Sequence, residues 1–134
     1  MKILLLAAAL CLSACAARLD SVRLPRLATD EVRWYQVESI DASGSKHSSI
    51  LAVQGMEDGS SRWVHSDAFG APIARLIATP EGWRRDGFVP PNRQAQELFA
   101  TLFDYVGSAQ STPYTLELGG QTWRILPLEH KAQP

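Results

Sequence analysis

The sequence predicts an α+β fold that is mainly β: a curved antiparallel sheet, an unclosed half-barrel, with one amphipathic helix on its concave face. Two observations lead to this prediction. Segments with the residue types of strands recur between residues 32 and 126, and turn-forming residues separate them. A single stretch, residues 92–107, has the apolar period of a helix. That helix must bury its apolar stripe, and the sheet is the other large apolar surface.

Five segments before the helix have strand character. Trp34 and Val37 suit a pleated, half-buried surface. Trp63 alternates with Arg62 and Val64, which places the tryptophan on the opposite side of its strand. Clusters of Asp, Ser, Gly and Pro mark the turns. The expected strands are residues 32–40, 48–54, 62–66 and 73–79 and a short piece at Trp83, and the expected turns are residues 41–45, 57–60, 67–70 and 80–82.

The stretch after Pro90 and Pro91 predicts the amphipathic helix. Asn92 is a suitable N-cap, because its side chain can accept an amide hydrogen of the first turn. Gly107 is expected to close the helix in the left-handed conformation. Six apolar residues recur at helical spacing and form one stripe. They are Ala95, Leu98, Phe99, Leu102, Phe103 and Val106.

Residues 114–126 predict a β-hairpin around Gly119 and Gly120. A two-residue glycine loop favours turns whose twist matches that of the flanking strands. In the register that this loop implies, apolar residues pair on one face and polar residues on the other. The expected pairs are Tyr114 with Ile125, Leu116 with Trp123, Thr115 with Arg124 and Glu117 with Thr122.

The first 14 residues have the order of a secretory signal peptide. Lys2 gives a positive start, residues 3–12 form an uncharged apolar run, and small residues precede Cys15. The run of about ten residues is too short to span a hydrocarbon core of ~30 Å as a helix. The ending Leu-Ser-Ala-Cys resembles the bacterial lipobox, which implies cleavage before Cys15 and acylation of that cysteine. The alternative is an ordinary secretory signal that places a cysteine near its cleavage site.

Processing at Cys15 shapes the expectations for the mature chain. Cys11 leaves with the signal peptide, so no thiol remains for a disulfide or a zinc site. The net charge falls from −1 to −2 with the loss of Lys2, which argues against nucleic acid as a partner. By the same resemblance, Ala16 after the cysteine implies export to the outer membrane, with the domain on the periplasmic face. Residues 15–31 are expected to form a lipidated tether, and residues 32–130 one domain.

Three residues are candidates for a metal or acid–base site: His47, His65 and Asp67. His65 and Asp67 lie two residues apart on a predicted strand and therefore point to the same side. The histidines lack the tight spacing of metal ligands, and no nucleophile–base motif is present in the sequence. We therefore expect surface or turn residues, and a protein that is not an enzyme and holds no metal or cofactor.

Phe69 and the four tryptophans each allow two interpretations. Phe69 stands in a turn, where exposure to water costs up to about 1.5–3 kcal/mol relative to burial. It either folds back into the core or meets a membrane or a hydrophobic cargo. The tryptophans fit either a packed core or the wall of a ligand cavity. They are Trp34, Trp63, Trp83 and Trp123.

The stretch from Trp63 to Gly82, and the helix after Pro91, resemble small bacterial outer-membrane lipoproteins with a LolA/LolB-like fold, some of them from gene clusters for aryl polyene lipids. In LolB-type proteins an unclosed barrel, covered by helices, holds the acyl chains of a lipoprotein. A protruding loop with an exposed leucine aids transfer into the membrane, and Phe69 matches that leucine in the strand–turn–strand pattern. This chain is shorter and has one clear helix, so its cover would be incomplete.

Two functions follow as expectations. The first is a monomeric carrier that binds or transfers a lipid or an acylated cargo in a cavity between helix and sheet, with Phe69 touching the bilayer. The alternative is a non-enzymatic accessory lipoprotein that scaffolds an envelope complex through protein contacts. The alternative requires a filled core and an exposed apolar patch outside. The residues expected to line the cargo cavity are Trp34, Trp63, Leu98, Phe99, Leu102, Phe103 and Trp123.

Overall fold

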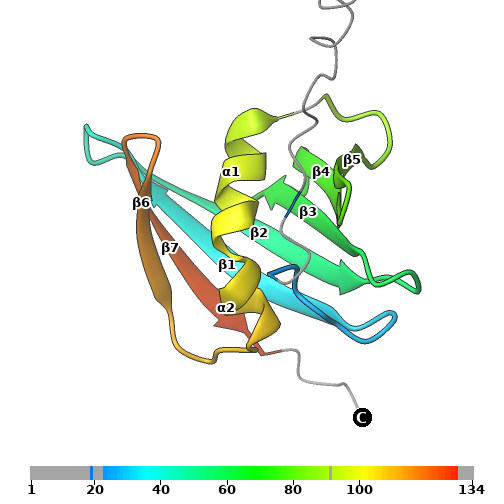
Figure 1. The fold of residues 1–134 in the computed structure, drawn as a ribbon. Helices are drawn as coiled ribbons and strands as arrows, with labels where there is room; N and C mark the ends of the chain where they lie inside the picture. The colour runs from blue at the N-terminus through cyan, green and yellow to red at the C-terminus, as the bar shows by residue number, and fades with distance from the viewer. Residues whose placement is uncertain (1–18, 20–22, 91, 130–134) are drawn as a thin grey trace, which may run out of the picture.

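The computed structural model describes residues 19, 23–90 and 92–129. In these residues the chain forms a seven-stranded antiparallel sheet that does not close on itself, with two helices packed against one of its faces (Figure 1). The predicted α+β, mainly β fold is therefore confirmed. The signal peptide and Cys15 lie outside the described residues. The described helices are too short and too polar to cross a membrane.

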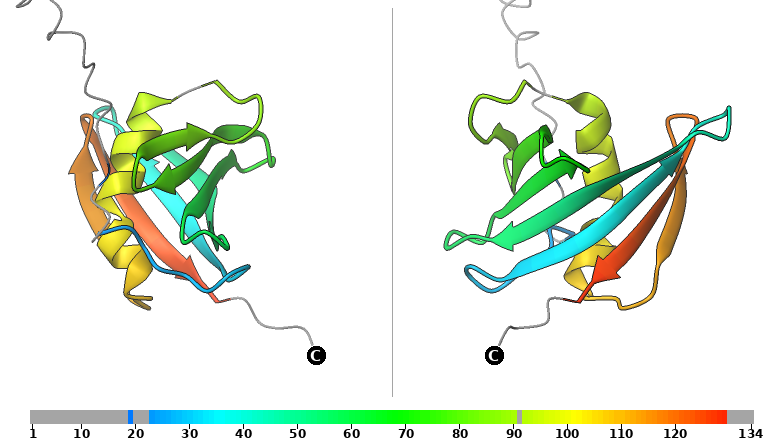
Figure 2. Two further views of the ribbon diagram at one scale, coloured as in Figure 1. Left: turned by 45° about the vertical axis from the view of Figure 1, so that its right-hand side comes forward. Right: turned by 180° about the vertical axis from the view of Figure 1, so that it is seen from behind.

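The strands are joined by short turns, except that two helices connect β5 to β6. The seven strands are β1 Val32–Ile40, β2 Lys46–Gly55, β3 Ser61–Asp67, β4 Pro72–Thr79, β5 Gly82–Arg85, β6 Tyr114–Leu118 and β7 Gln121–Leu128. The order across the sheet is β5-β4-β3-β2-β1-β7-β6, so β5 and β6 form the two edges. The sheet twists strongly, and its two ends rise on either side of the helices (Figure 2).

The predicted C-terminal hairpin is confirmed with its register. Tyr114 pairs with Ile125, and Leu116 pairs with Trp123. Gly119 and Gly120 have φ angles of 62° and 74°, the left-handed conformation that a two-residue primed turn requires. The hairpin docks through β7 onto β1, which brings the C-terminal strand into the interior of the sheet.

The predicted helix is divided into α1, Arg93–Thr101, and α2, Phe103–Gly107. At Leu102 the regular α-helix is interrupted, since φ is −95° and ψ −2°, at the border of the right-handed helical region. The hydroxyl of Thr101 donates to the carbonyl oxygen of Leu98 at 2.6 Å, a local bond that competes with the regular helix. The six stripe residues nevertheless remain on one face and are at most 5% exposed, so the amphipathic pattern is confirmed.

Of the two predictions for the ends of the helical region, the N-cap is confirmed and the closing glycine is wrong. Asn92 caps α1, since its side-chain oxygen accepts the amide hydrogen of Ala95 at 3.0 Å. Gly107, however, does not close the helix in the left-handed conformation. Ala109 takes that conformation instead, with φ 50°, and its amide donates to the carbonyl of Val106. The left-handed residue therefore comes two positions later than the glycine suggested.

Residues 23–31 lie against the domain and do not extend away from it. The described part of the expected 15–31 tether includes the buried Leu24, while Leu19 and Leu27 pack against the core. The guanidinium of Arg23 forms an ion pair with the carboxylate of Asp104 in α2 at 3.0 Å. In the sequence, the charged residues of this segment made its core-packing leucines difficult to recognise. The domain therefore begins before residue 32.

Gly55 at the end of β2 marks the tightest contact of this segment. A Cβ atom at position 55 would lie 2.2 Å from the carbonyl oxygen of Ala28. We expect Gly55→Ala to lower the free energy of unfolding by about 1–3 kcal/mol, because the backbone on one side must move. Urea denaturation followed by circular dichroism measures this loss. Gly107→Ala is the matched control, since its Cβ would lie 3.5 Å from Pro25, an ordinary contact. Equal stabilities of the two variants would contradict the close packing.

Candidate functional site

The space between the helices and the sheet is filled by apolar side chains. The ring of Trp63 stacks on Phe99 with centroids 5.2 Å apart, and Phe103 lies 5.6 Å from the same indole. Trp83 meets Trp63 edge-on at 6.5 Å. Six of the seven residues expected to line a cargo cavity are at most 8% exposed. They are Trp63, Leu98, Phe99, Leu102, Phe103 and Trp123.

Trp34, the seventh expected cavity residue, lies on the opposite face of the sheet. In β1 the side chains of Tyr35 and Val37 point toward the helices and are buried. Alternation along the strand then directs Trp34 outward, where it is 40% exposed. The structure therefore does not bring Trp34 together with the other predicted cavity residues.

The outer face of the sheet has a hollow of about 260 Å³ around Trp34. Trp34 pairs with Ala52 in β2, and Ala52 pairs with Val64 in β3, so three apolar side chains form a row across the strands. Arg62 borders the hollow. We call this hollow the outer-face groove. Its lining consists of Val32, Trp34, Ile50, Ala52, Gln54, Arg62, Val64 and Ser66.

Two charged groups flank the outer-face groove, and each has one carboxylate shared by two cations. On one side the carboxylate of Asp86 lies 3.2 Å from the guanidinium groups of both Arg62 and Arg75. On the other side the carboxylate of Glu38 lies 3.4 Å from Lys46 and 3.7 Å from Arg124. Further carboxylates lie beside both groups, since Asp30 accepts from Gln54 at 3.3 Å next to Arg62, and Glu117 lies on β6 next to the strand of Arg124. We call them the Asp86 triad and the Glu38 triad.

Two phenylalanines project from loops. Phe69 does not fold back into the core, since its side chain is 97% exposed. The carboxylate of Asp67 accepts the amide hydrogens of Phe69 and Ala71, each at 2.9 Å, which fixes a tight turn with Phe69 at its tip. Phe88, in the loop after β5, is 100% exposed. Both lie at the end of the sheet where β3 ends and β4 begins, and where β5 ends.

The histidine candidates are separated by the fold, and the expectation of a surface or turn residue is wrong for His65, which is buried within β3. His65 is 5% exposed and faces Phe99 of α1, and one ring nitrogen lies 2.7 Å from the hydroxyl oxygen of Ser49. Burial lowers the pKa of His65 to about 4, so its ring is neutral at physiological pH. His47 is exposed, and the carboxylate of Asp67 accepts backbone amide hydrogens in the turn that carries Phe69. Within residues 19, 23–90 and 92–129, no three acidic, His or Cys side chains are grouped as metal ligands.

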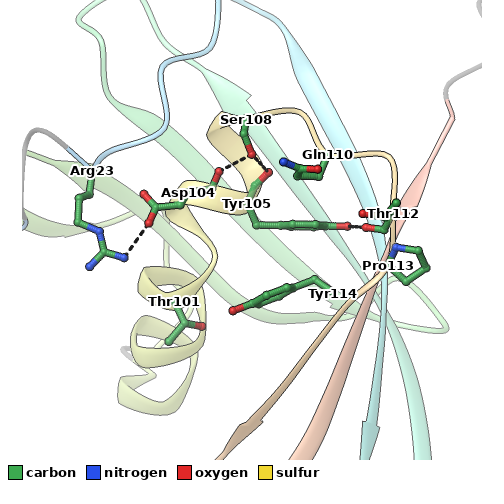
Figure 3. A pocket seen from close by; sticks show the side chains of 9 residues that line it. All are labelled: Arg23, Thr101, Asp104, Tyr105, Ser108, Gln110, Thr112, Pro113 and Tyr114. Carbon is green, nitrogen blue, oxygen red and sulfur yellow. Dashed lines mark hydrogen bonds and ion pairs between the residues drawn. The ribbon is translucent and has the colours of Figure 1, made fainter.

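A second hollow, of about 440 Å³, opens between α2 and the loop that leads to β6 (Figure 3). Several of its polar groups already have partners within the protein. The hydroxyl of Tyr105 donates to the carbonyl oxygen of Thr112 at 2.5 Å, and Arg23 pairs with Asp104. The rings of Tyr105 and Tyr114 stack on each other with centroids 5.2 Å apart. This hollow is therefore a less favourable binding site than the outer-face groove.

Sequence reasoning missed the groove and Phe88. Near the start of β1, apolar residues lie on both faces of the strand. The sequence pattern alone therefore did not show that Trp34 points outward. The exposure of Phe88 had a weak signal, because it follows Gly87 in a segment of turn residues.

Comparisons of the chain with protein-family models, with curated proteins and with solved structures find no match.

Proposed function

We propose that this protein is a non-catalytic accessory lipoprotein of the bacterial outer membrane that scaffolds an envelope complex through its outer-face groove. The observation that favours this function is the distribution of apolar side chains. Those facing the helices are packed against one another, whereas Trp34 and its neighbours form an apolar surface open to water. Exposed apolar surface bordered by polar residues is typical of protein contact sites.

Cys15 supplies the membrane anchor in this proposal. Leu19 packs against the core, and the four Cα-to-Cα steps from Cys15 to Leu19 span at most about 14 Å. An acylated Cys15 would therefore hold the domain close to the bilayer. The rings of Phe69 and Phe88 are exposed, and in this proposal they contact the membrane surface.

Lipid binding distinguishes this proposal from a carrier with an interior cargo. The purified acylated protein is titrated with a fluorescent fatty acid, and its organic extract is analysed for other lipids. We expect no saturable binding and no co-purified lipid, because side chains fill the space beneath the helices. One lipid released per protein molecule would contradict the proposal and favour the carrier.

The anchor itself is tested by Cys15→Ser in cells grown with radiolabelled palmitate. We expect complete loss of label and loss of sedimentation with membranes, because serine has no thiol to receive the lipid. Cys11→Ser is the matched control, since this cysteine leaves with the signal peptide. Unchanged labelling of Cys15→Ser would contradict the proposed anchor.

A further inference from the structure

We propose that two copies of this protein pair through their edge strands, with β6 of one copy antiparallel to β6 of the other, so that the sheet continues across a two-fold axis. The inference does not depend on the proposed scaffolding function. The outer-face groove lies on β1, β2 and β3, and it stays open when the sheet is extended at β6.

The β6 strand presents unpaired backbone groups along a free edge of the sheet (Figure 2). Leu118 and Gln121 flank the two-residue turn, so they exchange backbone hydrogen bonds. Bonded pairs alternate along a hairpin, and the N–H and C=O groups of Thr115 and Glu117 therefore point away from β7. No turn or loop backbone among the described residues bonds to them. Such a row of groups is a template for pairing with another strand.

The opposite edge of the sheet, β5, is better protected against such pairing. It has four residues, and two of them are the exposed Arg84 and Arg85. Short edge strands with charged side chains are a common defence against association. In β6 the single charged residue is Glu117, and its carboxylate accepts from the hydroxyl of Thr122 on the neighbouring strand at 2.6 Å. β6 is therefore the edge more open to a further strand.

The side chains of β6 match a second copy of the same strand. A two-fold axis at Leu116 places Thr115 opposite Glu117 of the other copy, so the outward backbone groups of both copies meet in register. On the face toward the helices, Leu116 then meets Leu116, and Tyr114 meets Leu118. Tyr114 is 38% exposed and the two leucines are half-buried, so all three gain apolar cover in the pair.

The charges on the outer face are compatible with this register. Arg124 pairs with Thr115 and with Glu38, so the three residues form one row across the strands. In the pair, Glu117 of the second copy extends this row, with only the small Thr115 between it and Arg124. The two glutamates of the pair are diagonal neighbours, about 7–8 Å apart. Each glutamate thus faces a threonine, with an arginine behind it, and like charges do not stand directly opposite each other.

The pairing lets both copies reach one membrane. Two antiparallel strands in one sheet are related by an axis perpendicular to that sheet, so the helices of both copies lie on the same side. The segment that leads to the anchor lies on this side too, because Arg23 pairs with Asp104 in α2 and Leu19 packs against the core. Cys15 of each copy is therefore close to the same face of the pair.

Cysteine cross-linking of the full chain in cell membranes tests the register. Leu116→Cys places two thiols directly opposite each other, at a Cα separation of about 4.5 Å that permits a disulfide. Thr115→Cys is the matched control, since its thiol is more exposed but lies about 7–8 Å from its copy, too far for a disulfide. After oxidation we expect at least about tenfold more dimer from Leu116→Cys. Equal yields, or disulfides to another protein in place of the dimer, would overturn the inference.

Proline substitution tests the backbone pairing. Thr115→Pro removes an outward N–H that faces water in a single copy, a change that an edge strand tolerates. Added to Leu116→Cys, it is expected to reduce the dimer to the yield of the Thr115→Cys control, while circular dichroism reports whether the fold is kept. Unchanged cross-linking would exclude pairing through β6. If Thr115→Pro unfolds the protein, Glu117→Pro removes the other outward amide in its place.

The unsubstituted chain is the blank for both measurements, because an acylated Cys15 has no free thiol. A disulfide dimer in this blank would contradict the anchor, which is a separate proposal. The same variants are then compared as purified protein in the Cys15→Ser background, where the expected ratio between Leu116→Cys and Thr115→Cys is unchanged. A ratio near one in that background would overturn the pairing.

Discussion

Replacement of Trp63 by alanine is expected to lower the free energy of unfolding by about 3–5 kcal/mol, a large part of the ~5–15 kcal/mol typical of a domain. Trp63 is fully buried and contacts Phe99, Phe103 and Trp83. Its indole N–H donates to the hydroxyl oxygen of Ser61 at 2.9 Å, so the substitution also leaves a buried hydroxyl without this partner. Residues 16–134 contain no cysteine, so no disulfide within them can compensate. Urea denaturation at about pH 7.5, followed by circular dichroism, measures the loss.

Trp34→Ala is the matched control for this prediction. The same residue type is removed from the opposite face of the sheet, where it is 40% exposed. We expect a loss of about 1 kcal/mol or less, because the site stays open to water and no enclosed cavity is created. The comparison also tests the filled core. Equal stabilities of Trp63→Ala and Trp34→Ala would show that an empty space beneath the helices costs little free energy. That result would favour an interior cargo cavity over a filled core.

Acidification from about pH 6.5 to about pH 4 is expected to cost the wild-type protein about 3 kcal/mol of stability through His65. The pKa of His65 is about 4 in the folded protein and 6.5 in the unfolded chain, because burial disfavours the charged ring. Between these values the unfolded state binds more protons than the folded state. The stability contributed by the neutral ring is therefore retained above pH 6.5 and lost as the pH falls toward 4. Urea midpoints measured across this range in small pH steps check the slope.

His65→Gln isolates the contribution of the histidine. Glutamine cannot titrate, and its amide can still bond to the hydroxyl of Ser49, the polar partner of the ring. We expect the variant to be less stable than wild type near neutral pH but to lose little further stability down to about pH 4.5. Hydrogen bonds lower the pKa values of Glu31, Asp41 and Asp58, so these carboxyl groups titrate below their ordinary range in both proteins. A parallel decline in both proteins would show that another group is responsible.

The elements that the sequence predicted well are those stabilised by contacts within one segment. The spacing from Ala95 to Val106 specified a buried stripe, because helical geometry alone places those residues on one side. The pairing of Leu116 with Trp123 followed from Gly119 and Gly120, since a two-residue turn leaves one register in which both faces match. The break at Leu102 was not predictable from this pattern, because it preserves the stripe.

The candidate site depended on contacts between distant segments. A strand alternates two sets of side chains, but the sequence of β1 does not say which set meets the helices, and Trp34 was therefore assigned to the wrong face. Likewise, the charges of residues 23–31 suggested a tether, whereas Arg23 pairs with Asp104 in α2. The triads join residues from strands and a loop that are distant in the sequence, so no local spacing predicts them.

The sequence by itself thus determined the order and type of the elements, the helical stripe and the register of the last hairpin. These depend on periodicity and turn geometry, which act over a few residues. Only the tertiary structure decided which face of β1 is buried, that the interior is filled, and that an apolar groove lies on the outer face of the sheet between two groups of paired charges. Burial and charge pairing are properties of whole surfaces, and a surface exists only after the strands have paired.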